Sequence, residues 1–180
     1  MSQSLRATPE EVIRRRIEAL ALRRKVARFF GLCAIVVVLL EVLFRCYIGV
    51  MVVERDDMKP FLVTGDIALY DRRNNEWNMG DVVVLEKDGH QHVGRIVARQ
   101  GDIVDLRDGM LWIDGARVVE EEIYYDSKAE GKMRFPLAVG DGEYLVLGDH
   151  RDDCVDGREY GLVEKDCFRG KILAVFRNCR

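Results

Sequence analysis

Residues 144–163 have the sequence YLVLGDHRDDCVDGREYGLV. The segment begins with an apolar run, Tyr144 to Leu147, which is followed by Gly148-Asp149 and then by a stretch rich in charged residues. A short apolar run closed by turn-forming residues is typical of a β-strand. The segment therefore predicts a strand that runs into a charged loop.

The same pattern of short apolar runs recurs upstream of this segment. Asp108-Gly109 separates two of the runs and predicts a hairpin, and Asp114-Gly115 repeats the signal. Helical periodicity is hard to find after residue 55, and the polar stretch 120–135 is typical of a loop. We therefore expect a mainly β fold, a twisted or coiled sheet, whose other strands come from Ile67–Tyr70, Val82–Leu85, His92–Ala98, Ile103–Leu106 and Met110–Ile113.

The N-terminal part of the chain differs in composition. Residues 29–53 are dominated by Leu, Val, Ile and Phe and are long enough to cross the hydrocarbon core of a membrane as a helix. Residues 1–28 carry eight Lys or Arg residues against three Glu residues, which places the N-terminus in the cytoplasm and the rest of the chain outside. Thr8-Pro9 is a helix start signal. We expect a basic helical segment on the lipid surface (1–28), a retained single-pass anchor in the cell membrane (29–53) and an extracellular β domain (54–180).

The charge balance and the cysteines exclude several kinds of function. The net charge is −3 although the N-terminal segment is basic, so the outer domain is acidic and would repel nucleic acid. Five cysteines occur without a metal-binding spacing, and we expect no metal and no cofactor. One disulfide among Cys154, Cys167 and Cys179 is possible, and spacing alone does not choose it.

Four segments in a fixed order resemble the motifs of type I signal peptidases, the S26-like family. The resemblance covers roughly residues 29–176, including Gly170-Lys171 near the end, and its segments are 57–60 (DMKP), 65–69 (GDIAL), 94–102 (GRIVARQGD) and 144–163. It implies the coiled β-sheet domain of that family, anchored by one N-terminal transmembrane helix.

The chain departs from the family pattern at the positions that carry the chemistry. Asp57 stands where the family has its nucleophilic serine, and Gly94 stands where it has the lysine that acts as the base. A serine hydroxyl needs a base to remove its proton, and an aspartate and a glycine supply neither group. Two further serine positions hold Cys154 and Gly157. The resemblance therefore implies an inactive member, a pseudo-peptidase without the Ser/Lys dyad.

The resemblance also implies roles for the residues that remain. Asp149, Asp156 and Arg158 match family residues that form structural ion pairs beside the site. In the family a cleft holds an extended substrate by strand pairing, which needs no serine. We expect a corresponding groove here, in which the negative charge of Asp57 would favour a basic group on the bound chain. If Asp57 were buried without a cation, its pKa should rise. The residues expected in the groove are Asp57, Met58, Pro60, Gly94 and Cys154.

The chain most resembles the signal-peptidase-like pilus assembly proteins of Gram-positive bacteria, in which Asp and Gly occupy the same two positions. This implies a chaperone-like accessory factor for sortase-linked pili, with pilin subunits and a pilus-class sortase as partners. Two alternatives stay open. One is an endopeptidase rewired around Cys154, His92 and Asp57, and the other is a regulatory subunit of a secretion or signal-peptidase complex.

Overall fold

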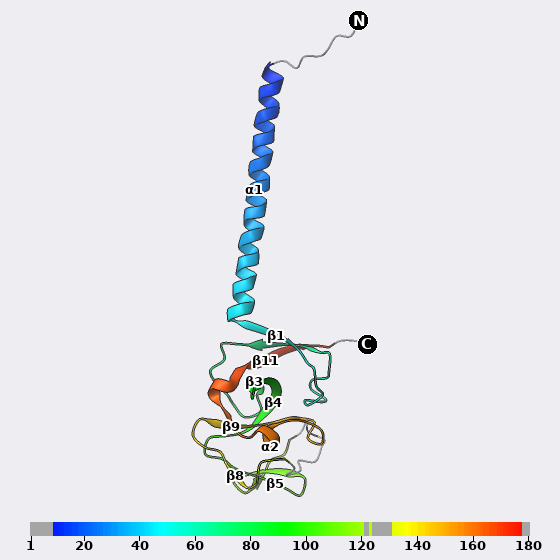
Figure 1. Cartoon of the computed structure of the whole chain (residues 1–180), viewed down its shortest axis with the longest axis vertical. Coiled ribbons are helices and arrows are strands. Elements are labelled where there is room, and N and C mark those ends of the chain that lie inside the picture. Colours follow the sequence, from blue (N-terminus) through cyan, green and yellow to red (C-terminus); the bar gives the residue numbers. More distant parts are fainter. Residues whose placement is uncertain (1–8, 121–122, 124–130, 178–180) are drawn as a thin grey trace. The chain divides into compact units, whose positions relative to one another are not determined.

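The computed structural model describes residues 9–120, 123 and 131–177. One helix and a β domain make up this part of the chain (Figure 1). Helix α1 (Pro9–Cys46) begins at the proline of the expected start signal. Its segment Leu22–Cys46 is long and apolar enough to cross a membrane. The backbone groups of a helix are satisfied internally, as a lipid environment requires. This helix is therefore long and apolar enough to be the membrane anchor that the sequence predicts.

The predicted extent of this helix at its C-terminal side was wrong. The helix ends at Cys46, and residues Ile48–Val52, expected to finish the membrane span, form strand β1. This strand pairs antiparallel with β2 (Ile67–Asp71), so its hydrogen bonds go to a neighbouring strand. Composition did not separate the two, because the apolar β-branched residues of an edge strand look like a continuation of the span.

Two antiparallel sheets form the β domain. The larger has the order β1-β2-β11-β3-β4-β9-β10, and its further strands are β3 (Val82–Lys87), β4 (His90–Arg99), β9 (Glu143–Leu147), β10 (Val163–Glu164) and β11 (Phe168–Phe176). The smaller has the order β7-β6-β5-β8, with β5 (Ile103–Arg107), β6 (Met110–Ile113), β7 (Ala116–Arg117) and β8 (Leu137–Ala138). Besides α1, short helices occur at α2 (Gly157–Tyr160) and η1 (Lys165–Cys167). The expected mainly β class is confirmed.

The predicted hairpins form for the reason that the sequence suggested. Asp108 and Gly109 have φ values of 53° and 71°, the left-handed conformation that a tight turn between β5 and β6 requires. Asp114 and Gly115, at 51° and 78°, make the same turn before β7. The expected loop over 120–135 lies mostly outside the described residues.

Three clusters of buried side chains hold the domain together. One lies between the two sheets and includes Val104, Leu111 and Leu145. The second surrounds Trp77 and Phe168, whose ring centroids are 4.6 Å apart. The third contains Met58, Leu62, Ala68 and other residues near the start of the domain. The segment that follows β1 is therefore anchored in the core rather than free to move.

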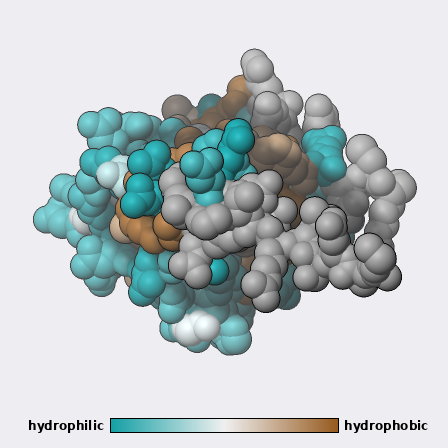
Figure 2. Space-filling view, turned by 90° about the horizontal axis from the view of Figure 1, so that it is seen from above, coloured by the Kyte–Doolittle hydropathy of each residue, from teal (hydrophilic) through white to brown (hydrophobic). Residues whose placement is uncertain are grey.

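Hydrophobic residues also remain on the surface. Figure 2 shows hydrophobic atoms among hydrophilic ones on the face that it presents. On the strands, Val50, Val52, Ile67 and Phe176 are exposed. Val52, Ile67 and Phe176 share one face of the sheet, because Ile67 is paired with both of the others.

We predict that Gly49→Ala destabilises the domain, because a Cβ atom at this position would overlap the ring of Tyr70, its cross-strand neighbour. The expected loss is about 1–3 kcal/mol of unfolding free energy, typical of overpacking. Val50→Ala on the same strand removes an exposed side chain and should cost less than about 1 kcal/mol. Denaturant unfolding of the full chain in detergent micelles measures both, and equal effects would contradict the packing described here.

Candidate functional site

A groove of about 700 Å³ runs along the larger sheet, between the chain from Val50 to Met58 and residues 90–93 of β4. Both walls present strand edges. Among the described residues, β1 pairs on one side only, with β2, while β4 pairs with β9 only from Arg95 onward. Backbone groups along His90–Gly94 on that side of β4 are therefore open to an added strand.

Asp57 lies in the wall of this groove with only 7% of its surface exposed. Its carboxylate accepts a hydrogen bond from Arg55 Nε at 2.9 Å. This bond and the negative charge of Asp57 raise the pKa of Arg55. The backbone carbonyl of Asp57 accepts a hydrogen bond from His150 N at 3.0 Å. Asp57 is therefore buried with a cation beside it, so the expectation stated for an unpaired Asp57 does not apply.

Gly94 lies in the middle of β4, opposite Val83, and is buried. A Cβ atom placed on it would lie 2.5 Å from Val146 Cγ1 and 3.1 Å from the carbonyl oxygen of Leu147. Val146 is itself fully buried and its branched side chain has little freedom to move. A methyl group of Val146 thus fills the space next to position 94, and any larger side chain there would require β9 or Val146 to shift.

Cys154 lies in a different cavity, of about 290 Å³, beside Asp156 and Arg158. Its thiol donates to Asp156 Oδ2 at 3.2 Å and accepts from Arg158 Nη2 at 3.2 Å. Burial, followed by the charge of Asp156, raises the pKa of this thiol to about 12. Cys154 and Cys167 are both free thiols, and Cys179 lies outside the described residues. Because the thiolate is the nucleophile, Cys154 is poorly suited to attack a peptide bond.

His92 lines the groove near Asp57. Burial lowers its pKa, and the nearby charge of Asp57 opposes that effect more weakly. Its ring packs against Tyr160 with centroids 4.9 Å apart, and its Nδ1 has no hydrogen-bond partner among the described residues. Within this part of the chain no hydrogen bond joins His92 to Cys154, so the Cys/His arrangement of the rewired peptidase is not formed.

The three residues expected in structural ion pairs do form them. Arg158 binds Asp156 through Nε at 3.0 Å and Nη2 at 3.1 Å, and both side chains are at most 7% exposed. Asp149 is held by Arg95, with Nε to Oδ1 at 2.9 Å and Nη2 to Oδ2 at 2.6 Å. Two separate ion pairs thus hold the loop after β9, one to β4 through Arg95 and the other to α2 through Arg158.

Sequence reasoning missed several members of this site. Arg95 and Arg151 both lie within the motif segments 94–102 and 144–163 but received no role. Arg151 is fully buried, donating to Gly148 O at 2.7 Å and to Glu120 Oε1 at 2.6 Å. A buried arginine needs such acceptors. The arginines within the motif segments could therefore have been predicted to form ion pairs at the site. Arg55 was also missed, although it lies two residues before Asp57.

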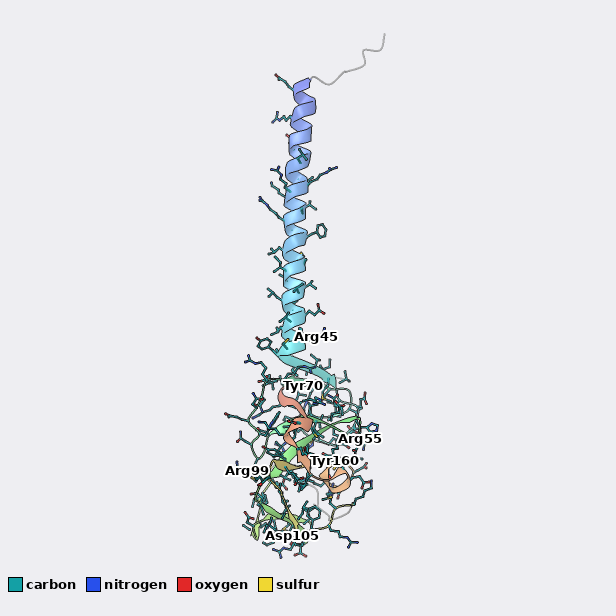
Figure 3. The ribbon with its side chains drawn as sticks, turned by 60° about the vertical axis from the view of Figure 1, so that its left-hand side comes forward. Arg45, Arg55, Tyr70, Arg99, Asp105 and Tyr160 are labelled. Atoms are coloured by element: carbon teal, nitrogen blue, oxygen red, sulfur yellow. The ribbon has the colours of Figure 1, made fainter. Side chains whose placement is uncertain are left out.

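The structure brings together only part of the expected groove. Asp57 and Met58 line it, and Gly94 follows its lining residue Val93. Pro60 is exposed and does not line it, and Cys154 belongs to the separate cavity described above. Gly157 opens α2, where a Cβ atom would lie 2.6 Å from Val146 O. Figure 3 shows Arg55 and Tyr160 in the same part of the β domain, consistent with His92 lying near both.

The chain is similar in sequence to known signal peptidases. The family model described as signal peptidase, peptidase S26, matches residues 23–177. Signal peptidase I S of Bacillus subtilis (strain 168) is 30% identical over 155 residues, which are 79% of this chain and 84% of that protein. An inactive signal peptidase IA of Staphylococcus aureus (strain MRSA252) is 28% identical over 130 residues, 67% of this chain and 74% of that protein. A solved signal peptidase I of Enterococcus faecalis V583 has a TM-score of 0.48 and 22% identity, covering 56% of this chain and 98% of that one.

We predict that Arg158→Met destabilises the domain far more than the same substitution of an exposed arginine. The change leaves the buried carboxylate of Asp156 without its cation, which typically costs about 3–5 kcal/mol. Arg169→Met breaks the exposed pair with Glu86 and should cost at most about 1 kcal/mol. Urea unfolding of the two variants beside the unaltered protein makes the comparison, and a small loss for both would mean that the buried pair stabilises little.

We also predict that Cys154 resists alkylation. With a pKa of about 12, the thiolate fraction at pH 8 is on the order of 10⁻⁴, against roughly one in four for an unperturbed thiol. Iodoacetamide should therefore modify Cys154 about a thousandfold more slowly than a cysteine in a short peptide, and the rate should climb until the pH nears 12. Peptide mass mapping gives the rates. Rapid modification at pH 8 would restore Cys154 as a candidate nucleophile.

Proposed function

The chain belongs to the signal peptidase family, peptidase S26, and from this membership we propose that it is a non-catalytic member that holds an extended protein segment. The observation that carries the proposal is the occupation of the two reactive positions. Asp57 is tied to Arg55, and the space beside Gly94 is filled by Val146. Neither position carries the serine hydroxyl or the lysine amine that the family uses for acyl transfer.

Among the described residues near the groove, Cys154 and His92 are the other candidates for the missing chemistry, and neither is suited to it. Cys154 is a half-buried thiol that Asp156 and Arg158 contact, and its pKa is raised to about 12. His92 is held toward its neutral form by burial, but it has no thiol or hydroxyl partner to activate among the described residues. A general base needs its nucleophile within hydrogen-bond reach. The rewired endopeptidase is therefore the weaker alternative.

The groove has the features that binding of an extended protein segment requires. The groove between β1 and β4 is about 700 Å³, and its walls carry the unpaired edges described above. An extended chain placed there gains main-chain hydrogen bonds, and apolar side chains such as Val52 and Val93 give it a surface to pack on. Holding a segment in this way requires no reactive residue.

We propose further that the held segment belongs to a pilin subunit and that binding assists the polymerisation of sortase-linked pili. The support is the resemblance to pilus assembly proteins that carry Asp and Gly at the same two positions. The basic N-terminal segment supports an orientation with the N-terminus in the cytoplasm and the β domain outside, where pilins are assembled. The groove would then face substrates that have already crossed the membrane.

Site-specific crosslinking in the living bacterium tests this proposal. A photoreactive phenylalanine analogue at Gln91, an exposed groove residue of β4, should capture a pilin subunit. The same analogue at Arg117, an exposed residue of β7 in the other sheet, should capture none. Mass spectrometry of the adduct identifies the partner and the contacting segment.

The captured partner separates the alternatives. An adduct between Gln91 and an extended pilin segment supports the pilus role. Capture of an active signal peptidase or a secretion component would instead support a regulatory subunit and overturn the pilus proposal. Equal capture of pilin from both positions would show that the groove is not the binding surface.

A further inference from the structure

The Asp57 carboxylate has an unusual position for a charged group that performs no chemistry. It is nearly enclosed in the groove wall, yet its hydrogen bonding is incomplete. Arg55 Nε contacts Oδ2 alone, and within the described residues Oδ1 accepts no hydrogen bond. A carboxylate has acceptor sites on both oxygens, so Asp57, which lines a groove large enough for a ligand, retains an acceptor that no described residue uses.

Another cation can easily replace Arg55 as the ion-pair partner of Asp57. Its side chain is 56% exposed, whereas that of Asp57 is 11% exposed. The two residues are only two positions apart, so the pair anchors no distant element. Releasing Arg55 costs little for the cation itself, because water solvates its exposed guanidinium, and the cost of an unpaired Asp57 is avoided when another cation binds there. Another cation could therefore take its place at small cost.

The groove supplies no second cation. Among the described residues that line it, Arg55 is the only lysine or arginine, and the other charged or ionisable members are Glu54, Asp57, His90 and His92. Burial favours the neutral form of His92, so it does not neutralise Asp57 near neutral pH. With Arg55 displaced, a bound segment would have to bring its own positive charge to avoid leaving Asp57 unpaired.

We propose that Arg55 occupies a cation-binding site in the empty groove, and that the held segment carries a lysine whose ammonium group replaces the Arg55 guanidinium on Asp57. This inference rests on the proposed function, since it names the chemistry of the segment held in the groove. Asp57 is thus the specificity-determining residue of the groove. Its charge selects the segment, while strand pairing along β4 supplies affinity that does not depend on sequence.

A lysine fits this position better than an arginine. Its ammonium is a compact charge on a flexible stem that can reach past the strand edge to an enclosed oxygen. A bound segment without a cation would bury the Asp57 carboxylate further or leave Arg55 in the groove, and either outcome weakens binding. The groove therefore discriminates by charge at one point along the extended chain.

The test uses the full-length protein in detergent micelles and two pools of blocked nine-residue peptides. The central residue is fixed as Lys in one pool and as norleucine, its uncharged counterpart, in the other, while the remaining positions are mixtures of Ala, Ser, Thr and Val. Pools are incubated with immobilised protein and the bound peptides are quantified by mass spectrometry. We expect the lysine pool to be retained about tenfold more, as for one hydrogen bond between charged groups.

Three variants assign the preference to the proposed residues. Asp57→Asn keeps the shape of the side chain and should abolish the preference. Arg55→Ala removes the competing cation and should raise the preference above that of the unaltered protein. Asp56→Asn is the matched control, because Asp56 pairs with Lys59 and Thr64 outside the groove lining, and the preference should not change. Melting temperatures of the variants show that each is folded.

The outcomes separate this inference from the proposed function. If both pools bind equally well, or if Asp57→Asn retains the lysine preference, the groove still holds extended segments but Asp57 does not select them. If neither pool binds the unaltered protein, the groove is not a peptide-binding site and both proposals fail. A preference lost equally in Asp56→Asn would assign the effect to general surface charge and overturn the role of Asp57.

Discussion

The arrangement of the site depends on the hydrogen bonds that the carboxylate of Asp156 accepts. This buried group accepts hydrogen bonds from the backbone N–H groups of Gly148 and Arg158, from the guanidinium of Arg158 and from the thiol of Cys154. It therefore joins the end of β9 to the start of α2, for which it is the N-cap. With so many donors, the charge is well compensated in an interior that would otherwise penalise it.

The loop that Asp156 fixes also affects the groove, because its backbone lies close to the backbone of Asp57. A Cβ atom on Gly148 would lie 2.6 Å from Asp57 O, so the loop after β9 lies directly against the segment that carries Asp57. His150 N also donates to Asp57 O at 3.0 Å. Holding the loop in place thus holds Asp57 in place. The ion pairs thus fix the position of Asp57 in the groove wall through the loop after β9.

The replacements at the reactive positions are mutually consistent in physical terms. A lysine at position 94 would require room that Val146 now occupies, and without a lysine there is no base to serve a serine at position 57. An aspartate at 57 brings a charge, and Arg55 is near enough to compensate it from the solvent side. The carboxylate of Asp57 therefore has its cation two residues away and needs none from the core.

Local sequence features were sufficient for much of this structure. The turns at Asp108-Gly109 and Asp114-Gly115 require a left-handed backbone that few other residues adopt, and short apolar runs bounded by such turns are typical of strands. The long apolar segment marked the anchor helix for a similar reason, since its composition suits lipid. The motifs at 57–60, 94–102 and 144–163, read as a resemblance, indicated the family and the two altered positions, Asp57 and Gly94.

Features that depend on contacts between distant segments needed the tertiary structure. Residues 48–52 are apolar in either a membrane helix or an edge strand, and only their pairing with β2 distinguishes the two. Arg95 and Asp149 are 54 residues apart, and no local pattern says which acid an arginine will bind. The space beside Gly94 and the exposed side of Arg55 likewise follow from how strands pack. Turn and membrane preferences are properties of short segments, whereas ion-pair partners and free volume belong to the assembled fold.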